Sequence, residues 1–393
     1  MSGVIHVITS LERGGAQRST LETAVRLHHP ARPQLLITGG APGAALDDEA
    51  ASRLGSRFLR VPALQNAIGL HDVAAVLDLS RLLAREVARL RPPVVVHTNS
   101  SKAGVIGRLA AKTVSGVVVV HTVHGFGLEA LGPRRSWLLE AVERGVAPLA
   151  DRYVFVSASD RARAAELGIA DDRRALLIRS GIDVQQLASL PDRLSTRHQL
   201  DIDGGARVIL TLANCKPQKD PLFHIDIFRA VVDRDPRARC LFVGDGPLRA
   251  QVEARVRALD LGKNVQLHGF VDDVRPLLAA ADVFLLASAW EGLPRSVLEA
   301  TAAGLPCVVR DTGWAADVAF AKSITALPID ASPASFADAL LKKHRAAPKK
   351  LPREFTQDGM LEALSELYDE LCGPVIDDQE RIRMLRRRRR LRR

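Results

Sequence analysis

The chain has little of several features that mark particular classes of protein. Aromatic residues make up 4% of its 393 residues, which argues against a surface built to stack nucleic-acid bases. No apolar run approaches the ~20 residues that span a bilayer. The first ten residues lack the basic region and long apolar core of a signal peptide, so we expect a cytoplasmic protein.

Cysteine is also scarce. The four cysteines are far apart and form no C-x-x-C pair, which disfavours a disulfide framework and a cysteine zinc site. We find no other metal-ligand, Walker or kinase motif, and we expect no metal and no cofactor. The cysteines are Cys215, Cys240, Cys307 and Cys372.

Excess positive charge is confined to one end of the chain. The net charge is +10, but residues 381–393 contain nine arginines and no acid, and the remaining chain has 46 basic against 45 acidic residues. The body therefore lacks the basic face of a nucleic-acid groove, and we expect no specific nucleic-acid partner. We predict a basic disordered tail at 378–393, because like charges repel. An anionic membrane surface suits such a tail and would hold the protein peripherally on the inner face of the cell membrane; attraction to nucleic acid, or no role, are the alternatives.

Length and periodicity indicate two α/β domains. At 393 residues the chain exceeds what one core usually accommodates. In both halves, short apolar runs alternate with helical patterns, as in parallel α/β folds. The stretch before Gly205 has no clear apolar period and contains Pro191 and paired glycines, which indicates a domain boundary. The predicted strands are 4–9, 34–38, 94–98, 117–121, 153–156 and 176–179, then 208–212, 240–243, 265–267, 283–287, 307–309 and 324–327.

The stretch from Asp282 to Val318 carries the clearest functional signal. It reads as strand, loop, helix and strand, with Glu291 in the loop after the first strand and Glu299 inside the helix. Open α/β sheets bind ligands in the crevice at this edge, so both carboxylates are candidates for ligand contacts. The amides of Gly292 and Leu293 lie near the predicted helix start, a geometry that suits an anion such as a diphosphate.

The segment EGLPRSVLEA, followed by AAGLP and a valine strand, resembles the E-x7-E motif of retaining glycosyltransferases of family four. The resemblance covers residues 4 to about 372. It implies an α/β fold of GT-B architecture: two facing Rossmann-like domains with parallel sheets, and a C-terminal helix that crosses back. The implied acceptor domain is 1–185 plus the helix at about 355–372, and the implied donor domain is 205–350. By the same resemblance Glu299 binds the nucleotide ribose and Glu291 lies beside the donor sugar.

Other loops add to the resemblance. Gly14 and Gly15 follow the first strand, where the family has a glycine-rich loop, although Gln17 stands where many members have glutamate. His124 lies just after a strand and resembles the family's sugar-contacting histidine. His97 and His121 lie within or at the ends of strands, where a hydrogen-bonded core histidine is the commoner explanation.

In the second half, Lys219 matches the lysine of the family's G-R-x-x-x-x-K segment and would face the donor diphosphate. Asn214 stands where arginine is most frequent, which leaves the second cation of that phosphate clamp unassigned. Gly244 and Gly246 open a helix as at many nucleotide sites, and Phe270 occupies the position of base-side contacts.

The resemblance implies a retaining, metal-independent hexosyl- or N-acetylhexosaminyl-transferase that uses a nucleotide-sugar, with a UDP-sugar as the first expectation. The segment SSKAGVIGRLAA resembles members that build surface polysaccharides, so the expected acceptor is a saccharide or lipid-linked saccharide. Two alternatives stay open. One is a sugar-nucleotide epimerase of the same fold, and the other is a non-catalytic scaffold that binds nucleic acid through the arginine tail.

Overall fold

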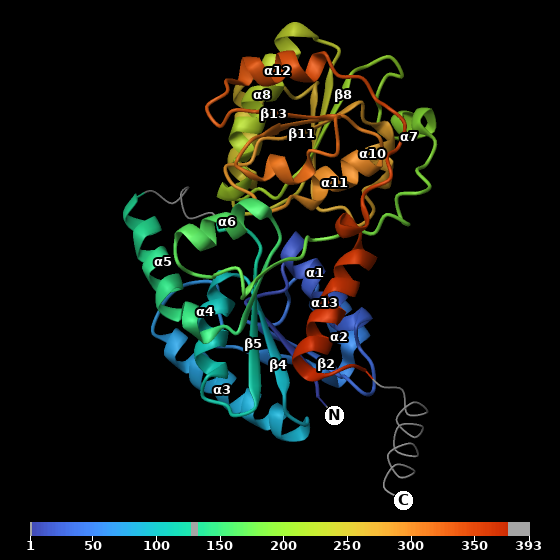
Figure 1. Ribbon diagram of the computed structural model, residues 1–393. Coiled ribbons are helices and arrows are strands. Elements are labelled where there is room, and N and C mark those ends of the chain that lie inside the picture. Colours follow the sequence, from blue (N-terminus) through green and yellow to red (C-terminus); the bar gives the residue numbers. More distant parts are fainter. Residues whose placement is uncertain (1, 127–132, 376–393) are drawn as a thin grey trace, which may run out of the picture.

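The computed structural model describes residues 2–126 and 133–375. The chain folds into two α/β domains, one above the other in Figure 1, with the C-terminal helix returning from the upper to the lower one. The predicted tail lies outside the described residues. No helix in the described part is long and apolar enough to cross a membrane.

The N-terminal domain is built on a seven-stranded parallel sheet in the order β3-β2-β1-β4-β5-β6-β7. The central strands are buried on both faces and are therefore almost continuously apolar. The strands are β1 Val4–Ile8, β2 Gln34–Gly39, β3 Phe58–Val61, β4 Val94–Asn99, β5 Val117–Val123, β6 Arg152–Phe155 and β7 Ala175–Leu177. The helices are α1 Gly15–Arg26, α2 Asp47–Leu54, α3 His71–Arg89, α4 Ser101–Ala111, α5 Pro133–Val146 and α6 Ala158–Glu166.

The C-terminal domain repeats this plan with six parallel strands in the order β10-β9-β8-β11-β12-β13. The strands are β8 Val208–Leu212, β9 Arg239–Val243, β10 Val265–His268, β11 Val283–Leu286, β12 Cys307–Arg310 and β13 Ile324–Leu327. The helices are α7 Arg193–Gln199, α8 Pro221–Arg234, α9 Arg249–Ala258, α10 Arg275–Ala280, α11 Arg295–Ala302 and α12 Pro333–Leu341. All four cysteines are free thiols.

The last helix, α13 (Gln357–Cys372), confirms the predicted crossing. It packs one apolar face on the central strands of the N-terminal sheet, where Leu364 and Leu367 join a core cluster with Val95 of β4 and Val120 of β5. Its start is capped by Thr356, whose hydroxyl accepts a hydrogen bond from the amide of Gly359. The chain therefore enters and leaves the upper domain on one side (Figure 1).

Four local elements differ from the sequence-based prediction. Strand β3 was not predicted, because it is only four residues long and mostly half-buried, and helix α2 was not predicted either. The polar segment NSSKAG predicts a loop before a helix at Val105, but helix α4 already begins at Ser101. Helix α7 lies in the stretch predicted to be the boundary. Arg197 attaches it to the C-terminal domain through hydrogen bonds to the carbonyl of Ala280 and the carboxylate of Asp282.

Candidate active site

Loops from the two domains meet between the carboxyl ends of the two sheets. The closest approach joins the loop after β5 to the loop before α11. A Cβ added to Gly292 would lie 2.6 Å from the carbonyl oxygen of His124, and one added to Gly125 would lie 2.9 Å from the amide nitrogen of Gly292. Gly125 also has a φ of +128°, which side chains rarely adopt. Glycine at both positions therefore allows the histidine loop to touch the E-x7-E loop.

Lys219 and Glu291 form an ion pair at this junction. Lys219 ends the short helix η4 (Pro217–Lys219), and its loop is tied to the other by a 2.9 Å hydrogen bond from the amide of Ala289 to the carbonyl of Gln218. Both side chains are largely buried. The residues predicted to face the departing phosphate and the donor sugar thus lie together, and each compensates the charge of the other.

Glu299 projects from α11 into a cleft of about 610 Å³ between the domains. This volume lies within the range of small-molecule sites, about 300–1,000 Å³. Burial raises the pKa of the Glu299 carboxyl, and the nearby Arg295 guanidinium opposes that shift. The Glu299 carboxylate has no hydrogen-bond or ion-pair partner among the described residues, so its oxygens are available to hydroxyl donors of a ligand.

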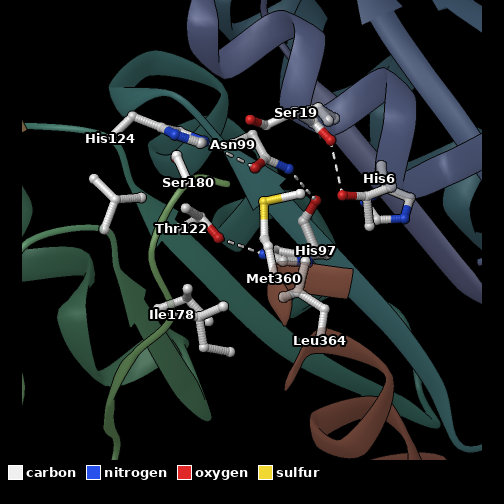
Figure 2. Close-up of a pocket in the computed structure, with 14 residues that line it drawn as sticks. His6, Ser19, His97, Asn99, Thr122, His124, Ile178, Ser180, Met360 and Leu364 are labelled. Atoms are coloured by element: carbon white, nitrogen blue, oxygen red, sulfur yellow. Dashed lines mark hydrogen bonds between the residues drawn. The ribbon is translucent and has the colours of Figure 1, made fainter. Parts of the chain in front are cut away.

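His124 lies just beyond β5, as predicted, and is held by one hydrogen bond (Figure 2). Its Nε2 is 3.1 Å from Oδ1 of Asn99, whose amide nitrogen donates to the carbonyl of His97. That arrangement makes Nε2 the protonated nitrogen and leaves Nδ1 as an acceptor. Burial, and then the charge of Arg295, lower the pKa of His124 to about 4, so its ring is neutral at physiological pH.

The other two histidines belong to the core, as the sequence suggested. His97 is hydrogen-bonded to Thr122 and to the hydroxyl of Tyr368 on α13, both at 2.6 Å, and Thr98 bonds to His121. Below His124, His97 and Thr122 border a cavity of about 30 Å³, which α13 closes on one side (Figure 2). That is room for about one or two water molecules.

The glycine-rich loop of the N-terminal domain reaches the predicted donor residues. The Asn214 side chain donates a 2.9 Å hydrogen bond to the carbonyl of Arg13, just before Gly14 and Gly15. The Arg13 guanidinium lies 5.3 Å from the centre of the Phe270 ring. Asn214 and Phe270 therefore lie beside the glycine-rich loop, although both follow it by about 200 residues or more in the sequence.

The remaining predicted donor residues serve packing in this structure. A Cβ on Gly244 would lie 2.1 Å from the carbonyl oxygen of Ala213, and one on Gly246 would lie 2.7 Å from that of Cys215. These glycines let their loop pack directly behind the Asn214 loop. Leu293 is buried in the C-terminal core. The ligand contacts predicted for these three residues stay predictions.

Comparison with known families decides the identity. Residues 192–357 match the family described as glycosyl transferases group 1, and residues 13–186 match the one described as glycosyltransferase family 4. Together the two matches cover both domains. The chain belongs to the family-four glycosyltransferases. The resemblance read from the E-x7-E segment is thereby confirmed.

The relatives of this glycosyltransferase are named for different substrates, and several of them come from bacteria. It is 30% identical over 259 residues, 64% of this chain and 66% of the relative, to the UDP-Gal:alpha-D-GlcNAc-diphosphoundecaprenol alpha-1,3-galactosyltransferase of Escherichia coli. It is 27% identical to the putative glycosyltransferase EpsD of Bacillus subtilis strain 168, over 55% of this chain and 58% of that one. The matched region thus spans about three fifths to two thirds of these two relatives.

Solved structures confirm the GT-B fold of this glycosyltransferase. The Anabaena HepE structure in complex with UDP superimposes with a TM-score of 0.71 at 18% identity, and the match covers 94% of this chain and 100% of that one. WaaG, a glycosyltransferase involved in lipopolysaccharide biosynthesis, superimposes with a TM-score of 0.62 at 18% identity over 93% and 95% of the two chains.

Arg295, which lines the cleft, and its buried partner Ser19 escaped the sequence analysis. Arg295 lines the same cleft as Glu299, and its Nη1 donates a 2.9 Å hydrogen bond to the hydroxyl of Ser19 on α1. The signal for Arg295 was its place between the two glutamates of the motif. Ser19 carried no signal, because it lies near Arg295 only in the folded chain.

Proposed function

We propose that this glycosyltransferase moves a hexosyl or N-acetylhexosaminyl group from a UDP-sugar to the hydroxyl of a lipid-linked saccharide, with retention of configuration and without a metal ion. One arrangement carries the proposal. The Lys219–Glu291 pair and the free Glu299 carboxylate lie at the two ends of the segment that opens α11. The amides of Gly292 and Leu293 lie between them.

The chemistry requires stabilisation of a departing nucleoside diphosphate, which gains negative charge as its bond to the sugar breaks. In the proposal, the ammonium of Lys219 and the amides at the start of α11 supply that stabilisation. The acceptor hydroxyl attacks from the face that the diphosphate leaves, and the leaving phosphate takes its proton. No separate general base is then needed.

The two carboxylates have different roles in this proposal. Glu299 accepts hydrogen bonds from the ribose hydroxyls, because its oxygens have no partner in the part of the chain that the structure describes. Glu291 and His124 position the donor sugar from opposite domains. A neutral His124 with Nδ1 as acceptor suits a sugar hydroxyl, which donates a hydrogen bond and carries no charge.

The donor and acceptor are proposed partly from the relatives. The Escherichia coli relative is named for UDP-galactose and a diphosphoundecaprenol-linked acceptor, and HepE was crystallised with UDP-glucose. An acceptor of this kind is held at a membrane, which is where the peripheral location on the inner face of the cell membrane would place the enzyme.

The decisive test combines nucleotide binding with product analysis. UDP-, GDP- and ADP-sugars should be screened for thermal stabilisation, since a ligand of the folded state raises its stability. The stabilising donor is then incubated with and without a lipid-linked saccharide, with EDTA present. Acceptor-dependent release of UDP in EDTA supports the proposal. Loss of transfer that a divalent ion restores would contradict the metal-free mechanism, and a new nucleotide-sugar formed without acceptor would favour the epimerase.

A further inference from the structure

Arg295 occupies a central place in the cleft. It is the first residue of α11, four positions after Glu291 and four before Glu299. In Figure 1, α11 in the upper domain lies above α1 in the lower one, and Arg295 bridges these two helices through Ser19. A Cβ added to Gly15, the first residue of α1, would lie 3.3 Å from Cδ of Arg295. Its aliphatic stem thus passes over the glycine-rich loop.

Arg295 differs from the other arginines that line the cleft. Among the described residues, each of the other four has a carboxylate within ion-pair distance, whereas Arg295 has none and makes one hydrogen bond to a neutral hydroxyl. The four ion-paired arginines are Arg18 with Glu49, Arg26 with Asp358, Arg53 with Glu49, and Arg275 with Asp273. A guanidinium is always charged and presents five donors, so the hydrogen-bonding capacity of Arg295 is largely unused.

The structure of a nucleotide-sugar indicates what Arg295 would meet. Its parts follow the order sugar, diphosphate and ribose. If Glu291 lies beside the sugar and Glu299 binds the ribose, the diphosphate passes the first turn of α11 between them. Arg295 stands on that turn. The amides at the helix start attract the same anion, and a guanidinium fork matches two phosphate oxygens.

The position that carries arginine in most of the family does not supply this charge here. Asn214 is neutral, and its side-chain amide is engaged by the carbonyl of Arg13. Lys216, two residues on, is paired with Glu12 at 2.6 Å. Of the lysine and the arginine expected to bind the diphosphate, this chain has only Lys219. These two positions therefore supply one cation instead of two.

We infer that Arg295 binds the donor diphosphate as the second cation of the phosphate clamp, in place of the arginine that Asn214 replaces. This inference rests on the proposed function. On donor binding, the guanidinium exchanges its hydrogen bond to Ser19 for phosphate oxygens. The clamp then has one cation on each side of the Gly292 and Leu293 amides.

The test compares UDP with uridine, which has the same base and ribose but no phosphate. Affinities are measured by calorimetry for the full chain and for Arg295→Gln, whose amide can still donate to Ser19. We expect UDP to bind Arg295→Gln about 10- to 100-fold more weakly than the unaltered chain, because the variant loses a charged hydrogen-bond partner. The affinity for uridine should change by less than about twofold. Arg295→Lys, which keeps the charge without the fork, should recover part of the UDP affinity.

Two control variants separate this role from a structural one. Arg275→Gln removes a cleft arginine that is already paired with Asp273, and Ser19→Ala removes the contact between the domains. Neither should change the ratio of UDP to uridine affinity. The inference is overturned if Arg295→Gln weakens the binding of UDP and of uridine equally. It is also overturned if Ser19→Ala lowers the ratio of UDP to uridine affinity as much as Arg295→Gln does.

Failure of the proposed function has a different signature. The unaltered protein would then bind UDP no more tightly than uridine, and Lys219→Ala would change neither affinity. That result would overturn both claims. If Lys219→Ala weakens UDP selectively while Arg295→Gln does not, the inference alone is wrong.

Discussion

The candidate residues of the two domains differ in charge, and we call the C-terminal set the charged wall and the N-terminal histidine group the neutral wall. In the charged wall, the residues that carry charge lie in two short segments, 214–219 and 291–299. In the neutral wall, His124 and the histidines beneath it are hydrogen-bonded and have lowered pKa values. Arginines of the N-terminal domain also line the cleft, but each is paired with a carboxylate. A departing diphosphate needs charge, whereas sugar hydroxyls need neutral donors and acceptors. The difference between the walls therefore matches the two ends of the proposed reaction.

The largest effect is expected at the charged wall. Lys219→Ala should lower kcat by about 10²- to 10³-fold, the usual loss when one stabilising donor is removed from a transition state. The protein should still fold but with lower stability, because the buried Glu291 carboxylate loses the cation that compensates its charge. Steady-state transfer and thermal unfolding measured together test this. A Lys219→Ala enzyme of normal kcat would remove the electrostatic argument.

A smaller effect on binding is expected at Glu299. Glu299→Gln should weaken UDP-sugar binding by about 10- to 100-fold, since hydrogen bonds to charged groups contribute about 1.5–3 kcal/mol. The unfolding temperature should hold or rise slightly, because the carboxylate has no partner among residues 2–126 and 133–375 and its burial is unfavourable. Calorimetry with the donor is the measurement. Unchanged affinity would eliminate the ribose assignment.

The neutral wall predicts a dependence of stability on pH. Burial lowers the pKa of both His6 and His124 to about 4, below the 6.5 of an unfolded histidine. Between these values the unfolded chain binds protons that the folded chain does not, so stability is full above pH 6.5 and falls towards pH 4. Each unit of pKa difference corresponds to about 1.4 kcal/mol per histidine.

This dependence can be measured by urea unfolding between pH 7.5 and 5. His6→Gln should be less stable than the unaltered chain at pH 7.5, because the 2.9 Å bond to Gln34 is disturbed, but should lose less stability on acidification. If the free energy of unfolding falls with pH equally steeply in both proteins, this buried histidine does not titrate as its surroundings predict.

The smallest effect on chemistry is expected from the tail. Removing residues 381–393 should abolish binding to anionic liposomes, since each basic residue near such a surface contributes on the order of 1 kcal/mol. Transfer to a soluble acceptor analogue should be unchanged, because none of the residues predicted to bind the donor or the acceptor is among residues 381–393. Liposome binding that persists without the tail would rule out its membrane role.

Much of the donor wall was predictable because its residues are close in sequence. The spacing of Glu291 and Glu299 across a loop and a helix placed both at the carboxyl edge of the sheet, and Lys219 followed from its place after β8. The acceptor wall was harder to predict. His124 was found from its place after a strand, but the bonds from His97 to Thr122 and Tyr368 join elements up to 271 residues apart.

By itself the sequence determined the architecture, because the alternation of buried strands with amphipathic helices is local and leaves a parallel α/β fold as the outcome for each half. It also determined the family, through the two glutamates and their surroundings. Tertiary structure decided how the charges are paired. That Lys219 meets Glu291, that Asn214 meets Arg13, and that Arg295 meets the Ser19 hydroxyl all depend on segments about 70 to 280 residues apart meeting in the fold. No local pattern encodes such meetings, because they arise from the packing of two sheet edges against each other.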